Sequence, residues 1–443
     1  MSIVKEKRSR FYSEFWLISA VVGLGFVSSF PIGFYEFRLV DLILIFSFVY
    51  FVVLLSNNKI DKKRKTTIFL LIIYLIIREY FDFVNVSSSQ NLRTLFGMSL
   101  TFLTPVIYLV VRESYFDGSK AMKLLILACI ISLLSQIGIL KWGESEASGL
   151  VDIGKYFNIS GGHLGSLNFQ ERTITVWRAL SVGITFAILF IHTKLWIKFV
   201  GIIGLFLQTA GGGGGRGGLV FLIVVPLILS LLYKGFGKSS IMKKLVLGSV
   251  IAAILMSVYL WAPFSSRDTL AKTNYTQTHF ERATEIFAIF TEGWSGAVSK
   301  GGFNARTTSY SEYLSRTLSE TNILLWGVGF SYGAAFQDVV NGQAHNVLLD
   351  TWALVGIFGL IFFIIFQIFI LADFKKLMMI TDIPNRDKLI LLSFAIALLY
   401  FYQPLLFQAS ASDRSFMIVF YLTAGMIKPL TRWLNGEFTK ANY

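Results

Sequence analysis

The sequence predicts an all-α, polytopic membrane protein with about twelve transmembrane helices. Of the 443 residues, 54% are hydrophobic and 15% are charged, whereas a soluble domain carries about a quarter charged residues. The mean hydropathy is +0.64. Apolar runs long enough to cross a bilayer recur at 15–34, 38–55, 67–84, 94–111, 121–140, 174–191, 195–211, 217–233, 244–262, 346–372, 388–408 and 414–430.

Basic residues supply the second observation. If the spans alternate in direction, every basic cluster falls on one side, which the positive-inside rule makes cytoplasmic. These clusters lie at residues 5–10, 59–65, 112–123, 194–198, 234–244, 375–388 and 428–440. The net charge of +14 is therefore a topology signal, and we expect no nucleic-acid partner. Both termini are expected in the cytoplasm, and the first span is interpreted as a retained helix without a cleavage site.

The whole chain, 1–443, is expected to form a single integral membrane domain, with a long outer loop over 263–345. A structureless loop of this length is uncommon, and capping boxes at Thr278 and Ser309 predict two short helices within it. The first would end at Gly293. The second would carry the amphipathic pattern of Tyr310, Tyr313, Leu314, Thr317 and Leu318.

A glycine run at 211–215 leads directly into Arg216 and Gly217, at the expected outer start of the eighth span. Free N–H groups and the dipole at a helix N-terminus favour anions, and glycine lets the backbone approach a ligand closely. Arginine adds a fork suited to phosphate oxygens. We interpret Gly215, Arg216 and Gly217 as an anion site; the alternative is a flexible turn whose arginine reaches lipid headgroups.

His345 and Asn346 begin the tenth span, again at the outer face. A neutral imidazole is the natural general base near pH 7, and His345 is the candidate. The alternative is a polar pair that only caps the helix. Asp350 follows one turn after Asn346, where it either orients His345 or bonds a neighbouring helix.

Further arginines lie at the outer side. Arg306 has no carboxylate three or four residues away, so a local salt bridge does not explain it and a binding role is favoured. Arg316 lies between Glu312 and Glu320, and an ion-pair array is its alternative explanation. The remaining candidates are Arg282, which has Glu285 within reach, and Arg172 and Arg178, which otherwise anchor the start of the sixth span.

Two further patterns limit the chemistry. The spacing of Arg78 and Asp82 predicts an internal ion pair. No His/Cys/Asp/Glu constellation has metal-ligand spacing, and the nearest acidic pair of the first outer loop is Glu144-Ser145-Glu146. We therefore expect a metal-independent site without a cofactor.

Together these motifs resemble the O-antigen polymerase and O-antigen ligase superfamily of bacterial envelopes. The resemblance is carried by Gly215-Arg216-Gly217, by Arg306 through Gly327-Val328-Gly329, and by His345-Asn346 through Gly356-Ile357-Phe358-Gly359. The order of these motifs and the long loop before the tenth span complete it. Glycine replaces the serine that usually precedes the arginine, and Leu354-Val355 stands where the family often has an acidic residue.

The resemblance implies an enzyme of the bacterial inner membrane with a periplasmic active site. It would transfer an oligosaccharide from a polyprenyl (undecaprenyl) pyrophosphate carrier to a sugar hydroxyl, inverting the anomeric centre. Arg216, Arg306 and His345 would be catalytic, and Gly215, Gly217, Arg172, Arg282, Asn346 and Arg316 would bind substrate. Its partners would be the lipid bilayer, chain-length regulators and flippases.

Polymerisation of polysaccharide repeat units is favoured over ligation to lipid A-core, although the sequence does not distinguish these two activities. A twelve-span transporter or lipid-linked oligosaccharide flippase is a rival class, which would predict repeat symmetry and interrupted helices. The sequence shows neither pattern. A non-catalytic scaffold would leave the glycine run unexplained.

Overall fold

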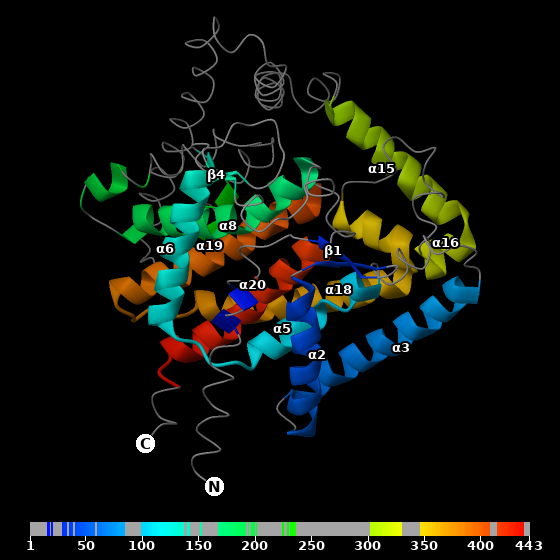
Figure 1. The fold of residues 1–443 in the computed structure, drawn as a ribbon, viewed down its shortest axis with the longest axis horizontal. Coiled ribbons are helices and arrows are strands. Elements are labelled where there is room, and N and C mark those ends of the chain that lie inside the picture. Colours follow the sequence, from blue (N-terminus) through cyan, green and yellow to red (C-terminus); the bar gives the residue numbers. More distant parts are fainter. Residues whose placement is uncertain are drawn as a thin grey trace, which may run out of the picture.

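The structure is a computed structural model that describes residues 29–32, 35–38, 40–57, 60–84, 99–136, 140–141, 151–152, 167–191, 302–329, 346–407 and 414–437, with short pieces within 16–20 and 194–235. Its helices are α2 Asp41–Ser56, α3 Lys62–Val84, α5 Pro105–Arg112, α6 Gly118–Gln136, α8 Leu167–Ile191, α15 Gly302–Ser319, α16 Thr321–Trp326, α18 Val347–Met378, α19 Asn385–Phe407 and α20 Arg414–Leu434 (Figure 1). Its strands are β1 Ser29–Ile32, β2 Tyr35–Arg38, β3 Leu140–Lys141 and β4 Val151–Asp152.

The described part of the chain is mainly helical, which agrees with the expected fold class. Helices α2, α3, α6, α8, α18, α19 and α20 occupy stretches where the sequence predicts spans. Within the described residues, α18 alone is both long and apolar enough to cross a membrane. Shorter apolar helices occur at Ser99–Arg112 and Ala179–Ile191, and α2 is a third.

The first predicted span, 15–34, is wrong at its C-terminal end. Residues Ser29–Ile32 form β1, which pairs antiparallel with β2 so that Ile32 lies opposite Tyr35. Pro31 has no N–H to donate within a helix, and Gly33 is a poor helix former. The apolar composition of 15–34 predicted a helix, but these two residues favour a hairpin at its end.

Helices α19 and α20 form the centre of the described structure. Residues 390–398 of α19 and 416–427 of α20 are buried along nearly their whole circumference. Helix α8 packs closely on α19, because a Cβ built on Gly183 would lie 2.3 Å from the backbone oxygen of Ser393. Gly425 of α20 similarly meets Val111 of α5. Small residues at helix contacts are typical of helix association in membranes.

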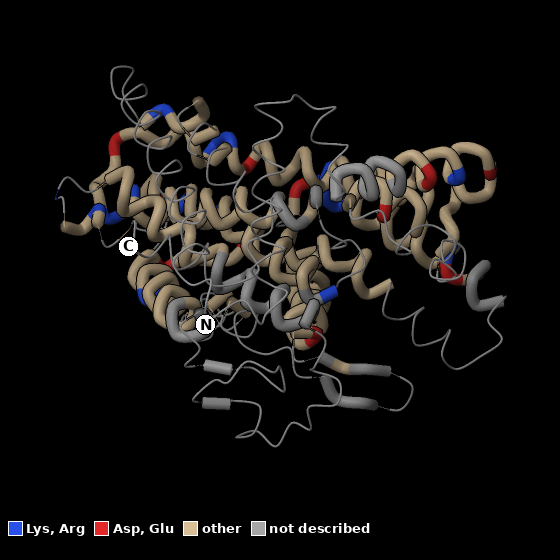
Figure 2. Tube along the Cα trace, turned by 90° about the horizontal axis from the view of Figure 1, so that it is seen from above, with Lys and Arg blue, Asp and Glu red and all other residues tan. Residues whose placement is uncertain are grey.

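The outward faces of several helices are apolar. Val49 and Val52 of α2 are 59% and 63% exposed, and Ile76 of α3 is 63% exposed. On α18, Ile368 and Leu371 are 56% and 49% exposed. Figure 2 shows the helices as long tan stretches in which charged positions are sparse. Soluble monomers rarely expose apolar surface of this extent.

Replacing Gly183 with alanine should destabilise the protein by about 1–3 kcal/mol, because the added methyl group must push α8 away from α19. Thermal unfolding of the detergent-solubilised protein measures the effect. Val49→Leu, which adds one carbon on the exposed face of α2, is the control. A Gly183→Ala protein that melts with the wild type would contradict this packing.

Candidate functional site

Several predicted site residues lie outside the described part of the chain. These are Gly215, Arg216, Gly217, Arg282 and His345. The predicted loop helix that begins at Thr278 also lies outside it. The convergence of Arg216 and His345 on one site therefore stays a prediction.

Three candidate arginines are placed by their backbone alone. Arg172 lies in the second turn of α8, and Arg178 lies in the same helix. Arg306 lies near the start of α15. The predicted helix start at Ser309 is wrong, since α15 begins at Gly302. Phe303 stands seven residues before Tyr310 and extends the apolar stripe upstream, which is the signal that the capping box obscured.

The apolar face predicted for the second loop helix is narrower than expected. Tyr313 and Thr317 are buried, whereas Leu314 and Leu318 are 40% and 52% exposed. The Nε of Arg316 lies 3.7 Å from the Glu320 carboxylate, which is the local ion pair that its spacing offered.

Asn346 caps α18. Its side-chain oxygen accepts hydrogen bonds from the N–H groups of Leu348 at 3.0 Å and Leu349 at 3.3 Å. This is the ordinary N-cap geometry, and it fixes the residue that directly follows His345. Asp350 is buried in the first turn, and its N–H bonds the Asn346 carbonyl at 2.8 Å.

Helix α18 is interrupted near its beginning, which the sequence did not reveal. Val355 has φ −124° and ψ 15°, and Gly356 has φ 67° and ψ −175°, so the helical path breaks between 354 and 357. The expectation that interrupted helices are absent is therefore wrong for α18, whereas the absence of a matched pair of interrupted spans stays a prediction. Gly356 opens the Gly-Ile-x-Gly motif, and its left-handed φ is a conformation that glycine adopts at little cost.

The end of the segment that the sequence predicts to be an outer loop fits against this break. Gly327 has φ 71°, and a Cβ on it would lie 2.5 Å from the Gly356 nitrogen and from the Leu354 oxygen. A Cβ on Gly356 would lie 2.2 Å from the Leu325 oxygen. One contact thus explains why glycine occurs at both 327 and 356, because two backbone segments lie directly against each other there.

Hydrogen bonds close this contact. The Val328 N–H donates to the Ala353 carbonyl at 2.8 Å, and the Trp352 indole N–H donates to the Leu324 carbonyl at 3.1 Å. A third contact comes from α3, where the Tyr74 hydroxyl donates to the Val355 carbonyl. We call this contact region, formed by Tyr74, Arg78, 324–328 and 352–356, the loop–span junction.

Arg78 completes the loop–span junction. Its Nε donates to the Trp326 carbonyl at 2.8 Å and its Nη2 donates to the Gly327 carbonyl at 3.3 Å. The predicted partner, Asp82, has a side chain outside the described part of the chain. Trp326 also stacks on the Tyr74 ring, with centroids 6.2 Å apart.

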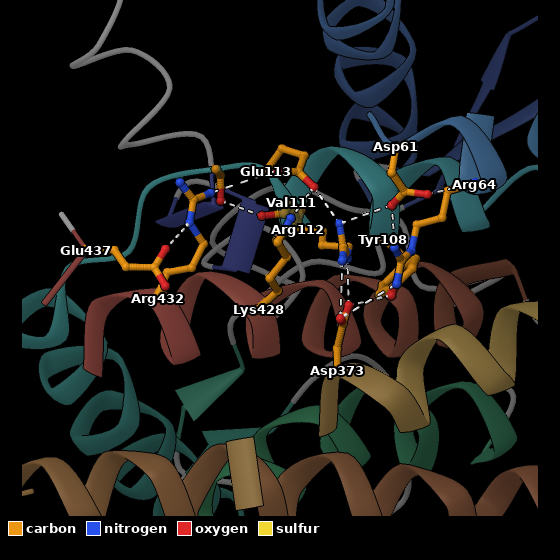
Figure 3. Close-up of polar contacts among 11 residues, drawn as sticks. Asp61, Arg64, Tyr108, Val111, Arg112, Glu113, Asp373, Lys428, Arg432 and Glu437 are labelled. Atoms are coloured by element: carbon orange, nitrogen blue, oxygen red, sulfur yellow. Dashed lines mark hydrogen bonds and ion pairs between the residues drawn. The ribbon is translucent and has the colours of Figure 1, made fainter. Parts of the chain in front are cut away.

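A second polar group lies at the other end of α3 and α18. We call it the charged cluster, and it consists of Asp61, Arg64, Tyr108, Arg112, Glu113, Asp373, Lys428 and Arg432 (Figure 3). At its centre, Arg112 Nε lies 2.6 Å from Asp373 Oδ2, and the Tyr108 hydroxyl donates to the same oxygen at 2.7 Å.

The rest of the charged cluster surrounds this pair. Lys428 Nζ lies 2.6 Å from Glu113 Oε1, and Arg64 Nη2 lies 3.6 Å from Asp373 Oδ1. Arg64 also pairs with Asp61. From the sequence, these arginines and Lys428 were interpreted only as signals of membrane topology, and Asp373 was not singled out. A lone acidic residue near the end of a long apolar helix was nevertheless a usable signal.

Acidic and basic side chains nearly balance in the charged cluster, so it is better explained as a structural lock than as an anion site. Within the described ranges, no group of three or more His, Cys, Asp and Glu residues is arranged to hold a metal ion.

No protein-family model matches this chain, and no curated protein matches it.

Asp373→Asn should destabilise the protein by about 1.5–3 kcal/mol, because it removes the charged acceptor of the buried Arg112 Nε and Nη2 and leaves that guanidinium only Glu113 and, at 3.8 Å, Asp61. Both side chains are less than 7% exposed, so water cannot replace the lost partner. Thermal unfolding in detergent measures the effect, with the exposed Asp382→Asn as the matched control. Equal melting temperatures for the two variants would contradict the lock.

The pKa of Asp61 lies below its ordinary value of 3.8. Burial raises this pKa, but the hydrogen bonds from Arg64 and the charges of Arg64 and Arg112 together lower it by more than burial raises it. A carboxyl group whose pKa is lowered in the folded protein stabilises the fold at pH values above its pKa in the unfolded chain. This contribution is lost as the pH falls through the pKa of the folded protein. The melting-temperature difference between wild type and Asp61→Asn should therefore be constant near neutrality and shrink below about pH 4. A difference that stays constant in acid would refute this.

Proposed function

We propose that this chain is a multi-pass glycosyltransferase of the bacterial cytoplasmic membrane, with about twelve spans and both termini in the cytoplasm. It takes an oligosaccharide from a polyprenyl pyrophosphate carrier at the outer face and joins it to a sugar hydroxyl. The product is a growing surface polysaccharide such as O-antigen.

The distribution of polar and apolar groups supports the membrane location. The exposed faces of α2, α3 and α18 are apolar, while Arg112, Asp373 and the Asp41–Arg414 pair, 2.7 Å apart, are buried. In addition, the helix ends that the positive-inside rule assigns to the cytoplasm meet in the charged cluster.

The observation that carries the proposal is the loop–span junction. It joins the outer loop to the tenth span where the chain has just passed His345 and Asn346. Helix α15, which carries Arg306, leads into α16 and also contacts α18 (Figure 1). The ends of two of the three candidate motifs, at Gly327 and Gly356, thereby meet, and this supports a common site for Arg306 and His345.

The residue types suit this transfer. Departure of the carrier releases a pyrophosphate, whose developing charge is stabilised by fixed cations and dipoles in a site of low dielectric. Arg216 and Arg306, with the N–H groups of the glycine run, supply them. His345 removes the proton from the acceptor hydroxyl. Direct displacement inverts the anomeric centre and requires no metal.

A ligase that attaches polysaccharide to lipid A-core is the second candidate, because it needs the same leaving group. Purified protein supplied with lipid-linked repeat units alone separates the two. Chain growth without a core acceptor identifies a polymerase, whereas product formed only when the core is added identifies a ligase.

The interruption of α18 is one observation that favours the transporter and flippase alternative. Transporters bind their substrates with such breaks, which often occur as a pair in matching halves of the chain. At the break in α18, however, the carbonyls of Ala353 and Val355 already accept hydrogen bonds from Val328 and Tyr74. This break is closed by protein groups, and catalysis remains the better supported proposal.

Arg216→Ala and His345→Ala should each shorten the polymer, because each removes a group that acts in the transition state. A lost base reduces the rate roughly 10²–10⁴-fold, and a lost oxyanion donor about 10²–10³-fold. Polymer length on gels and the rate of transfer from lipid-linked repeats measure the loss. Arg386→Ala, at an exposed position in the first turn of α19, is the control. Full-length polymer from well-inserted Arg216→Ala or His345→Ala protein would remove that residue from the mechanism.

A further inference from the structure

Helix α3 contacts both sides of the loop–span junction. Tyr74 and Arg78 are four residues apart, so they lie on one face of α3. Tyr74 bonds the carbonyl at the break in α18, and Arg78 bonds two carbonyls at the end of the outer loop. One helix face therefore holds two backbone segments that lie against each other.

These contacts meet a definite physical need. A buried carbonyl without a hydrogen-bond donor costs about 1–3 kcal/mol. The break in α18 and the end of α16 both leave carbonyls outside a regular helix. Arg78 is suited to the task, because its planar fork can donate to two oxygens at once, whereas lysine is a point charge. Its side chain is also buried, at 7% exposed, within the loop–span junction.

The loop–span junction sets the direction of a short helical segment. The part of α18 before the break, 347–354, begins at the Asn346 cap. Its other end is held by Val328, Tyr74 and the Trp352 contact with Leu324. The position of the cap relative to the outer loop therefore follows from the geometry of the loop–span junction.

We propose that Tyr74 and Arg78 are positioning residues for the transfer reaction: by holding the outer loop on the break in α18, they orient the start of the tenth span toward the loop helix that carries Arg306. This inference rests on the proposed function. Neither residue touches substrate in it, and both act through the backbone. A small displacement of catalytic groups can slow a reaction by about 10²-fold.

The experiment compares Arg78→Ala, Arg78→Lys and Tyr74→Phe in proteoliposomes supplied with lipid-linked repeat units. Arg78→Ala should lower kcat by about 10²-fold with little change in KM. Arg78→Lys keeps the charge but not the fork, and it should fall between Arg78→Ala and the wild type. Tyr74→Phe keeps the ring that stacks on Trp326 and should lower kcat by a smaller factor.

Hydrogen exchange supplies a readout that does not depend on activity. Peptides that contain Val328 should exchange faster in Arg78→Ala than in the wild type, because the hydrogen bond to Ala353 opens more often. Arg112→Lys is the control for general destabilisation, since it weakens the charged cluster at the opposite end. It should lower the melting temperature while leaving kcat and the exchange of Val328 unchanged.

Three results would overturn the inference. A raised KM with kcat retained in Arg78→Ala means that Arg78 binds substrate. Retained kcat and KM with faster exchange mean that the loop–span junction does not control the reaction. Unchanged exchange in Arg78→Ala means that Arg78 does not hold the loop. Failure of the proposed function is distinguished from all three, because the wild-type protein itself would then transfer nothing from the lipid-linked repeat.

Discussion

The structure depends on one constraint, which is that buried backbone polar groups must be paired even where a helix breaks. In α18 the regular pattern stops at Val355 and Gly356, and it is replaced by donors from elsewhere in the chain. The Val328 N–H and the Tyr74 hydroxyl take that role. Because those donors come from the outer loop and from α3, satisfying the break also fixes where the loop lies. A local irregularity thereby determines a long-range arrangement.

The charged cluster pairs buried charges at the opposite end of α3 and α18. There Arg112, Asp373 and Glu113 are removed from water, which is favourable only when each charge has close partners. Their pairing ties α3, α5, α18 and α20 together. Helices α3 and α18 are thus held at both ends, by backbone hydrogen bonds at one and by ion pairs at the other.

The sequence predicted where the helices lie better than where they end or break, for physical reasons. Apolar length locates α18 and α19, but it does not distinguish 15–34, where Ser29–Ile32 form a strand that pairs with Tyr35–Arg38. Gly356 was recognised as part of a motif, yet a single glycine in an apolar run does not reveal a break, because the break also needs Gly327 and Tyr74 from distant segments. The two partners of Arg78 within the described residues, Trp326 and Gly327, are contacted through backbone carbonyls, which no residue-type pattern encodes.

If the proposed function is correct, Arg216, Arg306 and His345 surround one carrier pyrophosphate. Spin labels placed pairwise at positions beside these residues, so that the arginines and the histidine are kept, measure their separation by pulsed dipolar spectroscopy after replacement of the single cysteine, Cys129. All three pairs should give short, narrow distance distributions, and the lipid-linked substrate should narrow them further. A pair separated by most of the length of the molecule, with or without substrate, would contradict it.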